Sequence, residues 1–577
     1  MRCQRLSAIG DLPERELALR FKWWATQTSA ERGSHTMMDW IFGRYSAISF
    51  SLLIALTAGG LFLIGAAPVI GLVIALIFFS IFLFGVYEHQ QKDSGIRANF
   101  PILARARFFF ESFRPELRQY FWEDDDDEVP YSRNQRDMVY QRARGELAAR
   151  PLGTIKDVYE EDYDWLNHSL RPIDIHQADF LTTVGLGEAA YDISLLNISG
   201  TSFGALSPPA IQALNAGASL GAFAHNTGEG SLSKYHQAGG GDLIWQISTG
   251  YFGCRDEKGN FDPEQFKSKA SLPQVKMIEI KLSQGAKPGH GGMLLGGKVT
   301  DEIAETRRIP VGKDCISPAL HSTFSTPTEL LDFVEQLRID SGGKPVGLKL
   351  CIGHPWEFLA IVKAMVNKQR FVDFITVDGS EGGTGAAPAE FTDNVGHPLD
   401  DALIFVDNCL IGAGIRERVK VAASGKIVSA YDIVRHCAFG ADWVNMARPF
   451  MFALGCIQAR DCASGRCPTG IATMDPGRYR VLDVRQRAQR IANFHHNTLK
   501  IVGEMIGAAG ISHPTHLTRR HIVRRLSSSE IRPADQIFPD VEPGALITGE
   551  PTGDPRLDVY WNKVSGDSFN FEGQPQG

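Results

Sequence analysis

Residues 374–388 read FITVDGSEGGTGAAP, a short apolar run that ends in a glycine-rich loop. From about residue 190 onward the pattern recurs, because short apolar, β-rich runs alternate with segments of helical period. Eight such buried strands predict an α/β fold, a parallel (β/α)8 barrel of the TIM type, with a doubly wound open sheet as the alternative. The eight runs are ISLLNIS (193–199), GAFAHN (221–226), MIEIKL (277–282), CISPAL (315–320), VGLKLC (346–351), FITVDG (374–379), VKVAAS (419–424) and WVNMAR (443–448).

The loops after these runs are rich in glycine and polar residues. In parallel barrels the carboxyl ends of the strands carry the active site. Backbone amides in such loops can cradle an anion, and a lysine there can sit beside an electron-rich ring or an anionic substrate. One glycine run alone indicates a tight turn, whereas several in register favour a ligand site. The loops include SGTSFGALS (199–207), HNTGEG (225–230), KLSQGAKPGHGG (281–292), DGSEGGTGAAP (378–388) and ASGK (423–426).

Three of the nine cysteines lie in LGCIQARDCASGRCPTG, residues 454–470. The rest of the chain is not Cys-dense, which argues against a disulfide framework and favours a reducing compartment. The gaps of five and four residues differ from the CxxC spacing of zinc sites. Pro468 directly follows the last cysteine, as in loops that hold iron–sulfur clusters. Three thiolates suit a three-iron cluster, or a four-iron cluster with an outside ligand, and three ordinary small hydrophobic side chains are the alternative.

An uncharged stretch precedes the barrel pattern. Residues 45–87 hold no Asp, Glu, Lys or Arg and divide at Pro68 into two apolar runs. Each run is long enough to cross a hydrocarbon core of about 30 Å, which predicts a transmembrane helical hairpin, with a buried core hairpin as the alternative. Basic residues flank both ends, so the positive-inside rule puts both flanks in the cytoplasm. We therefore expect a multi-pass protein of the inner (cytoplasmic) membrane whose catalytic part faces the cytoplasm.

The predicted order of segments follows from these features. It is an N-terminal cytoplasmic segment (1–44), the hairpin (45–87), a mixed connector (88–190), the barrel with its cysteine loop (191–525) and a C-terminal tail (526–577). The connector holds a helix-like stretch at 100–121 and an acidic run at 123–128 that is expected to be a solvated loop. Met37 and Met38 are candidate true starts. The net charge of −7 argues against a nucleic-acid partner.

Three motifs carry a family resemblance. KLSQGAKPG, EGGTGAAP and GCIQARDCASGRCPTGIAT resemble the flavin-binding synthase domain of glutamate synthase, in its separate, membrane-anchored form. The resemblance runs from about residue 190 to 510. It implies an FMN-bearing barrel, an oxidoreductase acting on CH–NH2 groups, that reduces 2-iminoglutarate, formed from 2-oxoglutarate and ammonia, to L-glutamate. It also implies a [3Fe-4S] cluster on Cys456, Cys462 and Cys467.

The resemblance also implies residue roles by position. Lys281 and Glu229 match catalytic positions, and Lys281 would stabilise reduced, anionic FMN. Gln284, Lys287 and Arg307 match the 2-oxoglutarate pocket, where fixed cations suit a dicarboxylate. Without the resemblance, Arg307 would be interpreted as a surface residue of a helix. The matched cofactor-binding positions are Gly200, Thr201, Ser202, Lys349, Gly382, Gly383, Gly385, Ser424, Gly425, Gly440 and Arg448.

Some features depart from the long members of the family. Those members carry a glutaminase domain with an N-terminal cysteine nucleophile, and Cys3 does not directly follow the initiator methionine. The expectation is that this chain hydrolyses no glutamine and takes ammonia that is free or delivered by a glutaminase partner. His290 stands where the long enzymes commonly have Glu, which leaves another 2-oxo acid or an amine open. The chain has no dinucleotide fingerprint, so the electron donor is expected to be a ferredoxin or a reductase subunit.

Two other function classes remain open at this stage. The first is a non-catalytic, membrane-anchored electron-relay protein that keeps FMN and the cluster. The presence of a dicarboxylate pocket argues against it, because a relay has no need of Lys287 or Arg307. The second is another kind of FMN barrel, which would not need the three-cysteine motif.

Overall fold

The computed structural model describes residues 40–91, 94–122, 129–146, 151–175 and 180–572 of the 577-residue chain. The chain forms two compact units, Met1–Val129 and Pro130–Gly577. Most of the predicted segment 1–44, including the candidate starts, lies outside the described residues. The acidic run 123–128 lies outside them as well.

The first unit is helical. Its helices are α3 (Ser46–Leu63), α4 (Pro68–Gln90), α5 (Gly95–Asn99) and α6 (Leu103–Leu117), followed by the wider turn η1 (Arg118–Trp122). The two predicted apolar helices are therefore present, and both are long and apolar enough to cross a membrane. They pack closely, because a Cβ on Gly71 of α4 would lie 2.9 Å from the carbonyl oxygen of Ala58 on α3.

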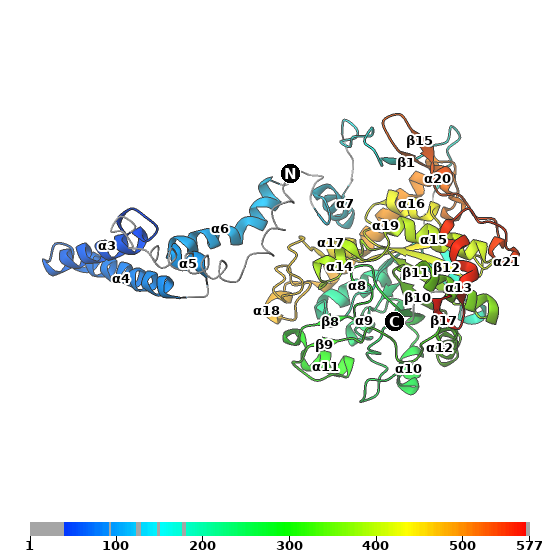
Figure 1. Cartoon of the computed structure of the whole chain (residues 1–577), viewed down its shortest axis with the longest axis horizontal. Helices are drawn as coiled ribbons and strands as arrows, with labels where there is room; N and C mark the ends of the chain where they lie inside the picture. The colour runs from blue at the N-terminus through cyan, green and yellow to red at the C-terminus, as the bar shows by residue number, and fades with distance from the viewer. Residues whose placement is uncertain (1–39, 92–93, 123–128, 147–150, 176–179, 573–577) are drawn as a thin grey trace, which may run out of the picture. The chain divides into compact units, whose positions relative to one another are not determined.

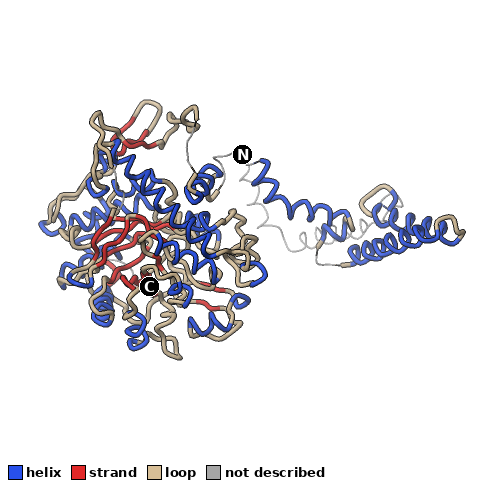
Figure 2. Tube along the Cα trace, turned by 180° about the vertical axis from the view of Figure 1, so that it is seen from behind, coloured by secondary structure: helices blue, strands red, loops and turns tan. Residues whose placement is uncertain are grey.

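The second unit is built on the predicted closed barrel of eight parallel strands (Figure 1). Figure 2 shows these strands grouped at the centre of the unit with helices around them. The last strand pairs with the first through Val444 and Leu196, which closes the ring. In order the strands are β4 (Leu196–Ile198), β5 (His225–Asn226), β6 (Leu243–Ile247), β7 (Val275–Lys281), β10 (Val346–Leu350), β11 (Phe374–Asp378), β12 (Lys420–Ser424) and β13 (Trp443–Met446).

One of the eight predicted barrel strands is wrong. CISPAL (315–320) is not in the barrel; its first two residues form β9 (Cys315–Ile316), which pairs antiparallel with β8 (Met293–Leu294). The barrel strand that was missed is β6, LIWQI, whose five residues are all buried. Strands of a parallel barrel are covered on both faces, whereas Ile316 and Leu320 are exposed and Pro318 cannot donate to a ladder.

Helices form the outer layer of the unit. Several begin at a proline that follows a capping side chain, as Asp262 does for α10 and Thr326 for α12. The helices are α7 (Arg133–Arg144), α8 (Pro208–Leu220), α9 (Lys234–Ala238), α10 (Pro263–Ala270), α11 (Asp301–Arg307), α12 (Pro327–Asp340), α13 (Pro355–Lys368), α14 (Ala389–Asn394), α15 (Leu399–Gly412), α16 (Ala430–Ala438), α17 (Arg448–Leu454), α18 (Pro476–Tyr479), α19 (Val484–Ala508), α20 (Ala534–Ile537), α21 (Ala545–Thr548) and α22 (Pro555–Tyr560).

Small sheets and single turns complete the unit. The sheets are β1 (Asp164–Leu166) with β14 (Ile522–Arg525) and β15 (Ile531–Pro533), β2 (Leu181–Val184) with β3 (Tyr191–Ser194), and β16 (Val564–Ser565) with β17 (Ser568–Phe571). The turns are η2 (Gly187–Ala189), η3 (Gly296–Lys298), η4 (Pro514–His516), η5 (Arg519–His521) and η6 (Trp561–Lys563). The C-terminal elements pack on α13, where Lys363 donates to the carbonyl oxygen of Trp561 (2.8 Å).

An apolar plug closes the amino end of the barrel. The hairpin β2–β3 contributes Val184 and Ile193, which pack against side chains near the amino ends of the barrel strands. Because this end is filled, a site inside the barrel opens toward the carboxyl ends of the strands. The partners of the hairpin in this cluster are Ala224, Ile244, Met277, Phe374, Ala422 and Trp443.

Candidate active site

A polar layer lies above the plug and forms the floor of the site. Glu279 of β7 is almost fully buried. Its Oε1 accepts hydrogen bonds from Asn226 and Gln246, each at 2.7 Å, and its Oε2 accepts one from Thr376, also at 2.7 Å. Burying a carboxyl group is costly unless its hydrogen bonds are made, and here both oxygens are satisfied. The network therefore fixes four strands against one another beneath the strand ends.

Lys281, the last residue of β7, lies at the centre of the predicted catalytic residues. Its Nζ donates to Oε2 of Glu229 (2.9 Å) and to Oε1 of Gln284 (3.0 Å). The structure thus brings together two predicted catalytic residues and one predicted substrate-binding residue. Burial acts to raise the pKa of Glu229, but Lys281, Arg307 and Lys287 together hold that pKa below its ordinary value.

Lys287 and Arg307 are the other two predicted pocket residues, and both are buried. Burial lowers the pKa of Lys287, opposed by the nearby Glu229. Arg307 points inward from α11, where it donates to the carbonyl oxygen of Phe203 (2.9 Å) and its guanidinium lies 5.3 Å from the ring centre of Phe252. The surface-helix interpretation of Arg307 is therefore wrong. Lys281 contacts Glu229 directly, and the charges of Arg307 and Lys287 also lower its pKa, so cations outnumber this carboxylate, an excess that suits a doubly charged anion.

A pocket opens beside Lys281. Glu229, Lys281, Gln284 and His290 line it, whereas Lys287 and Arg307 do not. The loop after β9 contributes Pro318 and Ala319, so the segment that is not a barrel strand still forms part of the site. His321 of the same loop lies 3.0 Å from the carbonyl oxygen of Lys281 and 3.1 Å from the Tyr251 hydroxyl, which fixes the loop against the end of β7.

A second ion pair lies on the neighbouring strands. Lys349 of β10 is directly opposite Lys281 in the strand register, and its Nζ is 3.5 Å from Oδ2 of Asp378 at the end of β11. Oδ2 of Asp378 also accepts a hydrogen bond from the amide of Gly285 (2.8 Å). Sequence reasoning named Lys349 and missed Asp378, although its position as the last residue of FITVD was a usable signal.

Several predicted cofactor-binding glycines allow close backbone approach. A Cβ on Gly200 would lie 3.2 Å from Cα of Gly228, and one on Gly383 would lie 2.8 Å from the guanidinium of Arg448. Gly425 has φ of 140°, a conformation that side chains rarely adopt, and a Cβ there would meet the amide nitrogen of Gly379 at 3.1 Å. A side chain at any of these positions would crowd the strand ends.

Hydroxyl and amide groups line the same rim. The Thr201 hydroxyl lies 2.6 Å from Nε2 of His225, and the Ser202 hydroxyl accepts a hydrogen bond from the amide of Gly230 (3.3 Å). The hydroxyls of Ser199 and Ser424 are 3.4 Å apart. Asn445, paired with Ser424 in register, has a buried Oδ1 without a hydrogen-bond partner among the described residues.

The loop after β11 holds Gly382, Gly383 and Gly385, of which Gly383 lies against Arg448. Arg448 donates to the carbonyl oxygen of Glu381 (2.7 Å) from the start of α17, which ties this loop to the one after β13. Close glycine approach and an unsatisfied Asn445 together fit a flat polar cofactor such as FMN at this rim.

Gly440 is not brought together with the other candidates. It precedes β13, at the amino end of the barrel, where its carbonyl oxygen accepts from Arg416 (2.8 Å) and a Cβ would lie 2.4 Å from the carboxyl carbon of Asp407. The structure therefore places Gly440 in an ion cluster away from the strand ends that carry the other residues.

The cysteine loop follows α17 and lies against the loop after β11. A Cβ on Gly385 would lie 3.8 Å from Cβ of Cys462. Lys298 is buried beside the loop and donates to the carbonyl oxygen of Cys462 (2.6 Å). α7 of the connector also contacts the loop, because the Tyr140 hydroxyl donates to the carbonyl oxygen of Cys456 (2.5 Å). Connector residues are therefore part of the barrel unit.

The three thiols differ in their surroundings. Burial raises the pKa of Cys456 to about 11, whereas hydrogen bonds from Thr469 and neighbouring amides outweigh burial and lower the pKa of Cys467. No three His, Cys, Asp or Glu side chains in the described part of the chain are placed to hold a single metal ion. In a multi-iron cluster each thiolate binds its own iron, so the cluster assignment stays a prediction.

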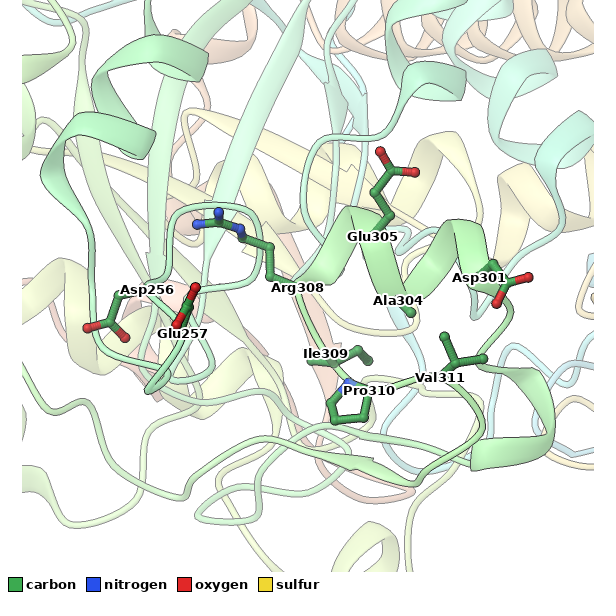
Figure 3. A pocket seen from close by; sticks show the side chains of 9 residues that line it. All are labelled: Asp256, Glu257, Asp301, Ala304, Glu305, Arg308, Ile309, Pro310 and Val311. Atoms are coloured by element: carbon green, nitrogen blue, oxygen red, sulfur yellow. The ribbon is translucent and has the colours of Figure 1, made fainter.

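A separate surface pocket of about 410 Å³ lies along α11 (Figure 3). It is lined by Asp256, Glu257, Asp301, Glu305 and Arg308 with apolar neighbours, and none of the predicted site residues lines it. Arg307 of the same helix turns to the opposite side, toward Phe203. One side of α11 therefore lines the surface pocket, and Arg307 on the other side points toward the candidate active site.

Comparison with known proteins identifies the family. The family model described as the conserved region in glutamate synthase matches residues 174–512. The glutamate synthase large subunit-like protein YerD of Bacillus subtilis (strain 168) is 36% identical over 517 residues, which cover 81% of this chain and 98% of that protein. The archaeal glutamate synthase (NADPH) of Methanocaldococcus jannaschii is 38% identical over 287 residues, which cover 50% of this chain and 53% of that enzyme.

Among solved structures, a mutant flavocytochrome b2 with pyruvate bound covers 72% of this chain and 85% of its own, at 11% identity and a TM-score of 0.40. That likeness is too weak to support any inference. The family model and the relative from Bacillus subtilis each suffice to assign the family. Both matches cover the barrel with its lysine, glycine and cysteine loops. This chain belongs to the glutamate synthase family, a family of oxidoreductases.

Proposed function

We propose that this chain forms L-glutamate by reductive amination of 2-oxoglutarate with ammonia through 2-iminoglutarate. The observation that carries the proposal is the cation excess at the barrel mouth, where Lys281, Lys287 and Arg307 all act on Glu229. A site of that sign attracts a dicarboxylate, and a buried arginine binds a carboxylate in a fixed orientation. The overall change consumes two electrons and two protons and releases one water.

The chain's own residues divide the work. Lys287 and Arg307 would bind the carboxylates and so orient the carbon that becomes the amine-bearing carbon. The ammonium of Lys281, held by Glu229 and Gln284, would place a proton donor at the reacting centre. The polar floor around Glu279 holds β7 rigid beneath this group.

FMN is the proposed cofactor of the same rim. Gly200, Thr201 and Ser202 would lie under the ring, Lys349 at its edge, and Gly382, Gly383, Ser424, Gly425 and Arg448 near its phosphate. When bound, FMN supplies two-electron reduction by hydride transfer. The close backbone approach at Gly200 and Gly425 supports this assignment.

The cysteine loop is the proposed site of a [3Fe-4S] cluster on Cys456, Cys462 and Cys467. The proximity of Cys462 to Gly385 supports an electron path from the loop to the rim. We propose a ferredoxin or a reductase subunit as the electron donor, and ammonia that is free or supplied by a glutaminase partner. The name of the archaeal relative points to NADPH as that enzyme's reductant.

The hairpin α3–α4 is proposed to anchor the chain in the cytoplasmic membrane with the barrel on the cytoplasmic side. The exposed apolar side chains along both helices support this, because they have no cover among the described residues of the unit. After alkaline carbonate extraction of cell membranes, the chain should stay with the lipid. Release into the supernatant would contradict the anchor.

The synthase is tested by anaerobic glutamate formation. Purified, flavin-reconstituted protein receives reduced methyl viologen, 2-oxoglutarate and ammonium, beside the variants Lys287→Ala and Lys258→Ala. Lys258 is an exposed loop residue and serves as the matched control. Glutamate from the wild type and Lys258→Ala, with loss in Lys287→Ala, supports the proposal. No glutamate from protein that retains flavin and cluster absorbance rejects it in favour of another 2-oxo acid or an electron relay.

A further inference from the structure

Helix α6 carries an aromatic face that the rest of its unit leaves exposed. At 100° per residue, Leu103, Phe109, Phe110 and Phe113 fall within an arc of about 120°. Phe109, Phe110 and Phe113 are 58%, 65% and 47% exposed. Their rings contact one another, with centres 5.7 Å apart for Phe109 and Phe110 and 4.8 Å for Phe109 and Phe113.

The aromatic character continues into the turn that follows. Tyr120, Phe121 and Trp122 of η1 are also exposed. Soluble surfaces rarely present so many adjoining aromatic side chains, and such a patch marks a contact surface. Tyrosine and tryptophan are enriched where a protein meets the boundary between lipid and water.

Basic side chains border this face. Arg107, Arg114 and Arg118 fall on one flank of the aromatic arc at helical spacing. The acids within α6 are Glu111, which pairs with Arg107 (2.8 Å), and Glu116. Arg107, Arg114 and Arg118 still outnumber them by one when Arg105, which pairs with Glu88, is left out. An aromatic face with an arginine border is the pattern of helices that lie in the plane of an anionic lipid surface.

The start of α6 is tied to the end of the apolar hairpin. Glu88 near the end of α4 is fully buried, and its Oε1 lies 2.6 Å from Arg105 of α6 and 3.5 Å from Arg97 of α5. A Cβ on Gly85 of α4 would lie 2.9 Å from the side chain of Ile102, just before α6. α6 therefore begins at the level where the uncharged run of α4 ends.

Aromatic residues just before α3 lie at the level of the end of α4. Trp40 and Tyr45, at the start of the hairpin, contact each other in a tilted arrangement and meet His89 at the end of α4 edge to face. A ring of this kind is typical of the membrane boundary. Both ends of the hairpin and the start of α6 thus share one plane.

We propose that α6 and η1, residues 103–122, lie in the plane of the membrane surface as a second lipid contact beyond the hairpin. The aromatic face enters the boundary between headgroups and acyl chains, and Arg107, Arg114 and Arg118 contact anionic lipid headgroups. The inference rests on the proposed membrane hairpin. It adds a contact that is sensitive to the charge of the lipid, which an apolar hairpin by itself is not.

The test uses the full chain in nanodiscs with a photocrosslinking benzoylphenylalanine at one position at a time. The positions are Phe109 and Phe113 on the aromatic face, Ser112 outside the aromatic arc as the matched control, and Leu76 in the middle of α4. Adducts are identified by mass spectrometry. Lipid adducts several-fold stronger at Phe109 and Phe113 than at Ser112 are expected. They should weaken when phosphatidylglycerol is replaced by phosphatidylcholine, or when Arg107, Arg114 and Arg118 are all replaced by glutamine.

Other outcomes separate the two proposals. Lipid adducts at Leu76 with none at Phe109 or Phe113, or protein adducts at those two positions, would overturn the in-plane helix and leave the hairpin intact. Equal labelling at Ser112 and Phe109 would also overturn it. No lipid adduct at Leu76 would reject the membrane hairpin itself, and with it the inference that rests on it.

Discussion

At the amino end of the barrel, Arg416 donates to Asp407 (2.7 Å), lies 3.0 Å from Asp442 and also donates to the carbonyl oxygen of Gly440. Arg519 lies 3.0 Å from the second oxygen of Asp407. Two arginines therefore meet the buried Asp407 and the partly buried Asp442, so these charges balance, and the exposed Asp540 lies a further 3.3 Å from Arg519.

At the carboxyl end, three cations act on the single carboxylate of Glu229, and only Lys281 makes a hydrogen bond to it. Among the described residues, the charges around Glu229 do not balance. Both ends bury charged side chains at comparable depth, so burial alone does not distinguish a site from a structural cluster. The excess of positive charge does distinguish them, because an anion from outside the chain can supply the missing negative charge.

The largest expected effect is a loss of stability when the balanced ion cluster at the amino end of the barrel is disrupted. Arg416→Met would leave Asp442 without its arginine and Asp407 with Arg519 alone, and an uncompensated buried charge costs about 3–5 kcal/mol. The denaturation midpoint, measured by tryptophan fluorescence, should fall while turnover per folded, flavin-loaded molecule stays unchanged. Arg370→Met, which removes an exposed pair with Asp332, should cost less than about 1 kcal/mol. If Arg416→Met instead lost turnover and kept normal stability, the amino-end cluster would not be purely structural, which contradicts the contrast between the two ends of the barrel.

The next effect concerns the unbalanced end. Lys281→Met should lower glutamate formation by about 10²–10³-fold, because it removes a preorganised cation from the reacting centre. Folding and flavin content should be retained. Lys276→Met is the matched control, since Lys276 lies on the same strand, is partly exposed and alternates to the outer face. Similar activity in both variants would show that Lys281 has no part in the reaction.

A smaller effect is expected at the rim. Gly425→Ala puts a Cβ at φ of 140° and 3.1 Å from the amide of Gly379, a strain of about 1–3 kcal/mol. FMN affinity, measured by flavin fluorescence in equilibrium dialysis, should weaken by roughly tenfold or more. Gly353→Ala follows β10 with open space around it and should leave the affinity unchanged. Equal FMN affinity in the two variants would place the cofactor elsewhere.

The smallest effect is a shift with pH. Burial lowers the pKa of Lys287 from 10.5, so its charge is lost at a lower pH than that of a free lysine. As pH rises through this lowered pKa, kcat/KM for 2-oxoglutarate should fall, because the cation that binds a carboxylate disappears. Lys287→Arg should move the fall to higher pH, since a guanidinium stays charged. A profile that is the same in wild type and Lys287→Arg would assign the fall to another group.

Local pattern predicted a large part of this protein. The apolar run 45–87 predicted two helices, because two apolar segments within a membrane can make all their backbone hydrogen bonds internally only as helices. Alternating periods predicted the barrel, since each short buried run needs a neighbour on both edges. The motifs around Lys281 and Cys462 pointed to the family because they are contiguous in the chain.

Tertiary structure decided the features that depend on residues distant in sequence. It placed 243–247 rather than 315–320 in the barrel, because the ring selects strands that can be buried on both faces. It turned Arg307 inward to Phe203, paired Lys349 with Asp378 and put Gly440 at the opposite end. None of these follows from local period, since each results from strands and helices meeting only when the ring closes.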